Sequence, residues 1–183
     1  MRALADEARL RRFMHALGSE PAAEGSVFFT GGATAVLIGW RTTTIDADIL
    51  VVPDTDRLLG LLPRLKEDLN LNIEIASPAQ FLPELPGWRE RSRFVAREGR
   101  VDFFHYDFYA QALSKVLRGY DRDLLDVAAM IDRGLVEKEA LLRHFEAIEP
   151  RLFRFPNIDP AAFRRAVQDA VGGAGPGSHS SGS

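Results

Sequence analysis

The chain has 183 residues, which is enough for one domain with a sizeable core and too few for two cores. Its formal net charge of -3 argues against a protein that binds nucleic acid or anionic membranes through a general basic surface. It has no cysteine, which excludes disulfides, thiolate zinc sites and cysteine nucleophiles. Neither a signal-peptide pattern nor an apolar run of membrane-spanning length is present, so we expect a cytoplasmic protein.

The first part of the chain alternates between helical and extended patterns. Apolar residues at intervals of three and four over residues 4–17 predict an amphipathic helix that covers a sheet. A second helical pattern over residues 54–69 contains Pro63, which either kinks the helix or splits it in two. Short apolar runs predict five strands, over residues 27–30, 45–52, 72–76, 93–97 and 100–106. The residues around Trp88 are expected to form an extended loop.

From Phe108 onward the pattern is helical. Four helices are predicted, over residues 109–117, 123–131, 138–148 and 160–171. We therefore expect an α+β fold, with a mixed β-sheet of about five short strands flanked by helices. Residues 1–107 form this sheet core, and residues 108–171 form a helical part packed on it as one compact unit. Residues 172–183 are rich in glycine and serine and are expected to be disordered.

Two aspartates, Asp46 and Asp48, interrupt the apolar strand at residues 45–52. Side chains at positions i and i+2 of a strand point to the same face, about 7 Å apart. At an effective dielectric of about 20 the two carboxylates repel each other by roughly 2 kcal/mol, and a divalent cation between them turns this into attraction. A half-exposed edge strand with solvated carboxylates is the alternative. The pair therefore indicates either a metal site or an ordinary edge strand.

The glycine pair Gly31-Gly32 lies between a strand and a short helix predicted over residues 33–38. The start of a helix presents backbone N–H groups and the positive end of a dipole, and the missing side chains let a phosphate approach closely. A tight turn without a ligand explains the same glycines. Arg41 lies in the loop between the glycines and the aspartates, where a phosphate needs a counter-charge.

This combination of motifs resembles the DNA polymerase β-like nucleotidyltransferase superfamily. The family pattern is a glycine turn after a strand, followed nine to thirteen residues later by Asp-x-Asp or Asp-x-Glu. Three further segments look like the AbiEii/MNT-type small nucleotidyltransferases often found as toxin–antitoxin components. They are Gly31-Gly32-Ala33-Thr34-Ala35, Arg41-Thr42-Thr43-Thr44, and Leu113-Ser114-Lys115 with Arg122-Asp123-Leu124-Leu125-Asp126. The resemblance covers roughly residues 25–135.

The resemblance implies a nucleotidyltransferase fold and an enzyme that moves a nucleoside monophosphate from an NTP to a hydroxyl on RNA, a protein or a small molecule. Asp46 and Asp48 would bind Mg²⁺ as catalytic residues. A third catalytic and metal-binding carboxylate is expected on a neighbouring strand, where Asp102 matches the family pattern and Glu74 is its rival. The residues implied in nucleotide binding are Gly31, Gly32, Thr34, Arg41 and Lys115.

Some alternatives stay open at the level of sequence. The family's usual serine is a glycine here, so Thr30 or Thr34 is the candidate hydroxyl. Lys115 is either a phosphate ligand or a solvated lysine on a helix surface. Asp123 and Asp126 are assigned to a turn and a helix N-terminus rather than to metal. The alternative function is a catalytically inactive protein of the same fold that binds a nucleotide or a cognate partner protein.

Overall fold

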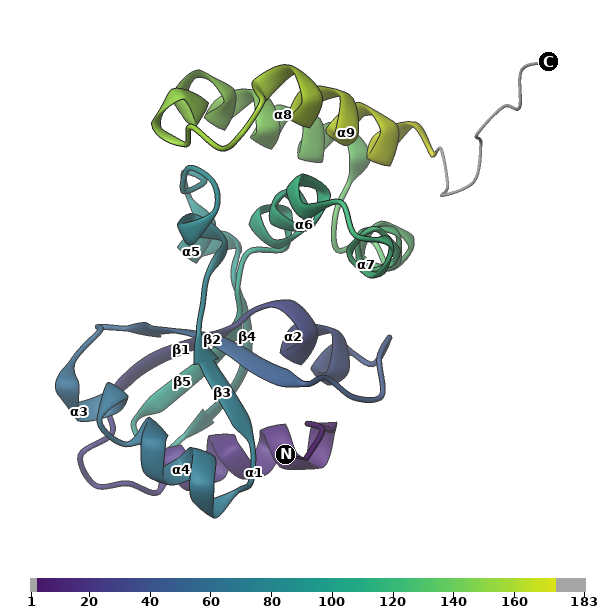
Figure 1. Cartoon of the computed structure of the whole chain (residues 1–183). Helices are drawn as coiled ribbons and strands as arrows, with labels where there is room; N and C mark the ends of the chain where they lie inside the picture. Colours follow the sequence, from purple (N-terminus) through teal and green to yellow (C-terminus); the bar gives the residue numbers. More distant parts are fainter. Residues whose placement is uncertain (1–2, 174–183) are drawn as a thin grey trace. The chain divides into compact units, whose positions relative to one another are not determined.

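The computed structural model describes residues 3–173 (Figure 1). These residues divide into two compact units, which we describe separately. The sheet unit consists of residues 3–77 and Arg89–Asp107, and the helical unit consists of Pro78–Trp88 and residues 108–173. The tail expected to be disordered falls, from residue 174 onward, outside the described residues.

The sheet unit is built on a mixed sheet that has five strands within residues 3–173. The strands are β1 (Gly25–Phe29), β2 (Asp46–Val52), β3 (Asn72–Ile75), β4 (Arg93–Glu98) and β5 (Val101–His105), in the order β3-β2-β1-β5-β4. The β1–β2 and β4–β5 pairs are antiparallel, whereas β1–β5 and β2–β3 are parallel. The expected fold class, a mixed sheet flanked by helices with a helical C-terminal region, is confirmed.

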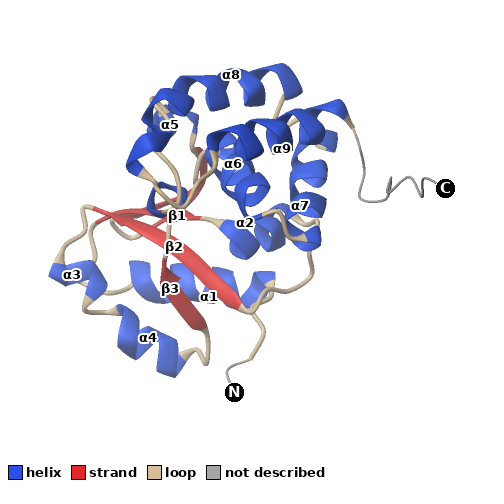
Figure 2. Ribbon diagram, turned by 45° about the horizontal axis from the view of Figure 1, so that its top comes forward, coloured by secondary structure: helices blue, strands red, loops and turns tan. Residues whose placement is uncertain are grey.

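One face of this sheet carries the hydrophobic core. Alternate residues of β2 are buried there, and helix α1 (Glu7–Gly18) packs its apolar stripe against the same face. The ring of Phe13 on α1 makes edge-to-face contacts with Phe29 and Phe103, at centroid distances of 6.4 Å. Figure 1 and Figure 2 both show α1 and α4 (Leu62–Asp68) on this side of the strands. The opposite face of β2 carries Asp46 and Asp48, followed by Leu50 and Val52, all of them half-buried.

Short helices and a 3₁₀ turn connect the strands of the sheet unit or follow them in the chain. Helix α2 (Gly31–Ile38) connects β1 to β2, and residues 54–69 form two short helices, α3 (Asp56–Leu59) and α4. The split version of the Pro63 prediction is thus correct, because proline lacks the N–H that a continuous helix needs. The predicted loop around Trp88 is wrong in part, since Trp88–Arg91 form the short helix α5. A 3₁₀ turn, η1 (Pro78–Gln80), follows β3.

The helical unit contains the four helices expected from their period. They are α6 (Phe108–Arg118), α7 (Asp121–Asp132), α8 (Lys138–Ile148) and α9 (Pro160–Gly172), with the 3₁₀ segment η2 (Glu149–Arg154) after α8. The Asp159 carboxylate caps α9 by accepting hydrogen bonds from the N–H groups of Ala161 and Ala162. Within residues 3–173, every helix is too short or too polar to cross a membrane.

The end of α1 packs directly on the β4–β5 turn. A Cβ atom added to Gly18 would lie 2.3 Å from Cβ of Glu98, and one added to Gly99 would lie 2.1 Å from the carbonyl oxygen of Gly18. Such distances are far below van der Waals contact, so the helix and the hairpin approach each other only because both residues are glycines.

We expect Gly18→Ala to destabilise the protein, although alanine is the better helix former by about 1 kcal/mol. Overpacking against the backbone of Glu98 costs about 1–3 kcal/mol, which outweighs that gain. Thermal and urea denaturation measure the change. Gly172→Ala is the matched control, since Gly172 also ends a helix and an added Cβ meets nothing within 4 Å. Equal stability of the two variants would contradict the clash.

Candidate active site

Asp46 and Asp48 lie on one face of β2. Burial alternates along the strand, so that Ala47 and Ile49 point into the core while both aspartates are half-buried on the opposite face. This is the arrangement that the i, i+2 spacing indicates. The two carboxylates therefore belong to the face of β2 that α1 and α4 do not cover.

The glycine pair begins helix α2 directly beside Asp48. The N–H of Thr30, at the end of β1, donates to the carbonyl oxygen of Asp48 at 2.9 Å. Gly31 has a φ of +56°, and a Cβ added there would lie 2.8 Å from Oδ2 of Asp48. Both the backbone angle and the close carboxylate favour glycine at this position. The first turn of α2 and the Asp48 carboxylate are thus immediate neighbours.

The other side of this turn is covered by the loop that precedes β2. A Cβ added to Gly32 would lie 2.0 Å from Oγ1 of Thr44 and 3.5 Å from Nη1 of Arg41. The guanidinium of Arg41 is therefore close to the start of α2, where the helix dipole is positive. Thr30 precedes the helix and makes no side-chain cap hydrogen bond. Together these groups make a positive region next to the carboxylate of Asp48.

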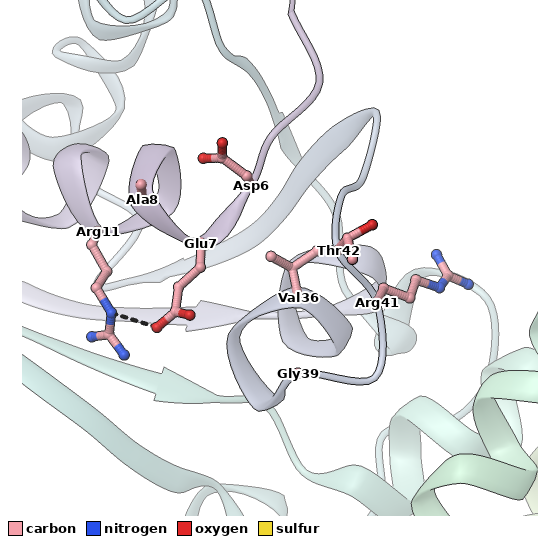
Figure 3. A pocket seen from close by; sticks show the side chains of 8 residues that line it. All are labelled: Asp6, Glu7, Ala8, Arg11, Val36, Gly39, Arg41 and Thr42. Atoms are coloured by element: carbon pink, nitrogen blue, oxygen red, sulfur yellow. Dashed lines mark hydrogen bonds and ion pairs between the residues drawn. The ribbon is translucent and has the colours of Figure 1, made fainter.

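A pocket lies on the far side of the loop, between the start of α1 and the end of α2 (Figure 3). Its volume is about 520 Å³. It is lined by Asp6, Glu7, Ala8, Arg11, Val36, Gly39, Arg41 and Thr42. Figure 3 shows the guanidinium of Arg41 directed away from Asp6 and Glu7, while Glu7 is paired with Arg11 at 2.8 Å. The charged end of Arg41 therefore does not point into this pocket.

Thr34 ties the helix to the strand. Its Oγ1 donates to the carbonyl oxygen of Phe29 at 3.0 Å, and Nδ1 of His105 lies 3.3 Å from Oγ1 of Thr34. Both side chains are buried. Burial, with a smaller effect from the positive charge of Arg93, lowers the pKa of His105 to about 4. Thr34 thus supports α2 from inside the core.

Strand β3 adds two polar side chains beside the aspartates. In the parallel β2–β3 register, Asn72 is the partner of Asp46 and Glu74 is the partner of Asp48. The Nδ2 group of Asn72 donates to Oδ1 of Asp46 and, at 3.1 Å, to Oε1 of Glu74. Asn72 is not among the residues that the sequence motifs indicate. Its i, i+2 spacing from Glu74, which repeats that of Asp46 and Asp48, is the signal that could have identified it.

Asp102 shares the face of the sheet with Asp48 but lies at its other end. Ser26 on β1 pairs with Asp102 on β5 and with Val52, four residues beyond Asp48 on β2. Strand spacing and rise then place Asp102 roughly 16 Å from Asp48. Both carboxylate oxygens accept from Arg97, at 2.5 and 2.7 Å, and these hydrogen bonds lower the pKa of Asp102. The register therefore brings Glu74 to Asp48, and it does not bring Asp102.

Lys115 belongs to the helical unit, where it joins α6 to α7. Its Nζ donates to Oδ2 of Asp126 at 2.6 Å and to Oδ1 of Asp123 at 3.2 Å, and Arg118 also donates to Asp123. The Lys115 side chain is only 4% exposed, so the solvated-lysine alternative is wrong. Asp123 lies in the first turn of α7, whereas Asp126 lies beyond it. All three charges contribute to packing between the two helices.

No protein-only metal site of three or more ligands is formed by the histidine, aspartate and glutamate side chains of residues 3–173. Asp46 and Asp48 thus supply two carboxylates, with Glu74 on the next strand. Magnesium in nucleotide-binding enzymes is usually held by one or two carboxylates together with substrate phosphates. The arrangement can therefore bind a cation and an anion at adjoining positions.

We expect His105 to make stability depend on pH. The folded pKa of about 4 lies below the ordinary value of 6.5, so below about pH 6.5 the unfolded chain binds a proton that the folded chain does not. Stability therefore falls as the pH decreases, by about 2 kcal/mol between about pH 7.5 and pH 5. The variant His105→Asn keeps a polar atom near Thr34. In denaturant titrations we expect this variant to lack the decrease in stability that His105 causes at low pH.

His15→Asn is the matched control for this measurement. His15 is a surface residue with a side chain that is 76% exposed, and it contacts Glu98 at 3.2 Å. The control should keep the pH dependence of the unchanged protein. If His105→Asn keeps it too, His105 is not held neutral in the folded state.

A protein-family model identifies the family of this chain. The model described as "Nucleotidyltransferase of unknown function (DUF6036)" matches residues 8–149, which include β1, α2, β2 and all the candidate residues above. No curated protein and no solved structure matches the chain. The match confirms the nucleotidyltransferase level of the resemblance seen in the sequence. The chain therefore belongs to this family of nucleotidyltransferases.

Proposed function

We propose that this protein transfers a nucleoside monophosphate from an NTP to a hydroxyl acceptor with the help of Mg²⁺. The observation that supports this proposal is the contact between the start of α2 and Asp48, whose Oδ2 lies 2.8 Å from the position of a Cβ on Gly31. A group that binds phosphate and a group that binds a cation are thereby adjacent. A metal–nucleotide complex presents the same two charges side by side.

The residues of β2 fit Mg²⁺ by their chemistry. The ion prefers oxygen ligands and keeps positions for phosphate oxygens and water, so two protein carboxylates are sufficient. Asp46 and Asp48 supply them from one face of the strand. When bound there, the ion would neutralise charge on the phosphates and polarise the acceptor hydroxyl.

The start of α2 and its loop are proposed to bind the triphosphate. Gly31 and Gly32 let the phosphates approach the backbone N–H groups of the first helical turn. Arg41, close to Gly32, supplies a positive charge and several N–H donors. Lys115 is not part of this proposal, because its amine is engaged by Asp123 and Asp126. Thr34 acts through its bond to Phe29 and not on the nucleotide.

For the third carboxylate we propose Glu74 instead of Asp102. Glu74 is exposed and is the register partner of Asp48. Asp102 is distant, and Arg97 lowers its pKa, which makes it a weaker base. In the transfer, the acceptor oxygen forms a bond to the α-phosphorus while the bond from that phosphorus to the bridging oxygen breaks. Pyrophosphate leaves with the electron pair, and the hydroxyl proton passes to the Glu74 carboxylate.

The acceptor class and the biological role follow only from the resemblance. RNA, a protein or a small molecule can each present the hydroxyl. The segment Arg41-Thr42-Thr43-Thr44 is similar to one in small toxin–antitoxin nucleotidyltransferases. We therefore also propose that this protein is one component of such a pair and binds a cognate partner protein. Incubation with labelled NTPs and each acceptor class separates these possibilities, since only the true acceptor becomes labelled.

We expect Asp48→Asn to lower kcat for transfer by at least about 10²-fold, because the change removes the charge beside the phosphate-binding turn. Transfer from labelled NTP, measured against Mg²⁺ concentration, gives the result. Asp54→Asn, the same substitution just beyond β2 at an exposed position, is the control and should keep full activity. Undiminished transfer by Asp48→Asn would refute the proposed site.

We expect Glu74→Gln to lower kcat by about 10²- to 10⁴-fold, as the loss of a general base does. Asp102→Asn should change kcat less than twofold, because Asp102 is paired with Arg97 at the other end of the sheet face. The reverse result would assign the third carboxylate to Asp102.

If calorimetry shows that the unchanged protein binds Mg-NTP but no acceptor is labelled, the inactive nucleotide-binding alternative holds.

A further inference from the structure

The side chain of Asn72 joins two of the acidic groups at the proposed site. Its Nδ2 donates to Oδ1 of Asp46 on the neighbouring strand and to Oε1 of Glu74 on its own strand. An amide nitrogen carries two N–H groups, so both of its donors are used by carboxylates. One neutral side chain thereby holds two negative charges of different strands near each other.

The geometry of an amide fixes how far apart the two bound oxygens lie. Two acceptors about 2.9 Å from one nitrogen, along directions about 120° apart, are separated by about 5 Å. Two oxygens on opposite sides of Mg²⁺ are about 4 Å apart. The amide nitrogen lies between these two oxygens, so the second oxygen of each carboxylate, Oδ2 of Asp46 and Oε2 of Glu74, is the one that a cation would bind.

The β2–β3 register by itself does not determine where these carboxylates point. Asp46 is the register partner of Asn72, and Glu74 is the partner of Asp48, so the backbone fixes only the Cα positions. Glu74 is exposed at an edge strand, where a long side chain has many rotamers. Two like charges also repel each other, which favours conformations in which they separate.

We propose that Asn72 is a positioning residue that preorganises the Asp46 and Glu74 carboxylates for a divalent cation. This inference rests on the proposed function, because it adds Glu74 to the cation that Asp46 and Asp48 are proposed to bind. Residues that hydrogen-bond metal ligands typically change metal affinity 10- to 100-fold when they are replaced. Asn72 binds no substrate in this role and acts through the two carboxylates.

The test uses the full chain and Mn²⁺ alone as the probe, because free Mn²⁺ is measured directly by electron paramagnetic resonance. We expect Asn72→Leu, which has a similar volume and no donor, to weaken Mn²⁺ binding about tenfold. Asn157→Leu, the same substitution at an exposed position of the helical unit, should keep the affinity of the unchanged protein. Thermal denaturation shows whether each variant is folded.

A kinetic measurement separates positioning from loss of structure. For Asn72→Leu we expect the Mg²⁺ concentration at half-maximal velocity to rise about tenfold, while KM for the NTP at saturating Mg²⁺ stays unchanged. In a Glu74→Ala background, the effect of Asn72→Leu on Mn²⁺ affinity should shrink to about threefold, because one of the two positioned carboxylates is gone.

The outcomes distinguish this inference from the proposed function. If the unchanged protein binds no Mn²⁺ and Asp46→Ala makes no difference, the proposed function itself fails. If the unchanged protein binds Mn²⁺ through Asp46 and folded Asn72→Leu binds it equally well, only the role of Asn72 is overturned. A tenfold loss of Mn²⁺ affinity in Asn72→Leu that becomes smaller in the Glu74→Ala background supports both the proposed function and the role of Asn72.

Discussion

The close approach of the Asp48 carboxylate to the first turn of α2 is the constraint on which the candidate site depends. The antiparallel pairing of β1 with β2 brings the end of β1 to Asp48, and the missing side chain of Gly31 lets the helix begin there. Thr44 and Arg41 approach Gly32 from the other side. A side chain at either glycine would meet these groups, so the strand, the turn and the loop can only adopt this arrangement together.

Charged residues in this protein divide into those that build the fold and those left at the candidate site. Lys115, Asp123 and Asp126 satisfy one another between α6 and α7, and Arg97 neutralises Asp102 on the sheet. Asp46 and Glu74 instead share a single neutral amide, which leaves their negative charge in place. Neighbouring carboxylates that keep their charge attract a cation, which is the basis of the proposal for the β2–β3 face.

The fold was largely predictable because its signals are local. The period of apolar residues identified the strands and the helices from α1 to α9, and Asp159 and Pro63 marked a helix start and a helix break. The exception was Trp88–Arg91, where prolines and a glycine indicated a loop and a short helix formed. A helix of one turn has no apolar period to detect, so its presence depends on packing with distant residues.

The sequence by itself determined the parts of the candidate site that are close in the chain. Gly31, Gly32, Asp46 and Asp48 were found from spacing, because side-chain direction in a strand and the needs of a helix start are properties of a few consecutive residues. Only the tertiary structure decided which carboxylate stands beside them. Strand order β3-β2-β1-β5-β4 places Glu74 opposite Asp48 and sets Asp102 apart, and it pairs Asn72 with Asp46. Strand order depends on long-range packing, which no local pattern contains.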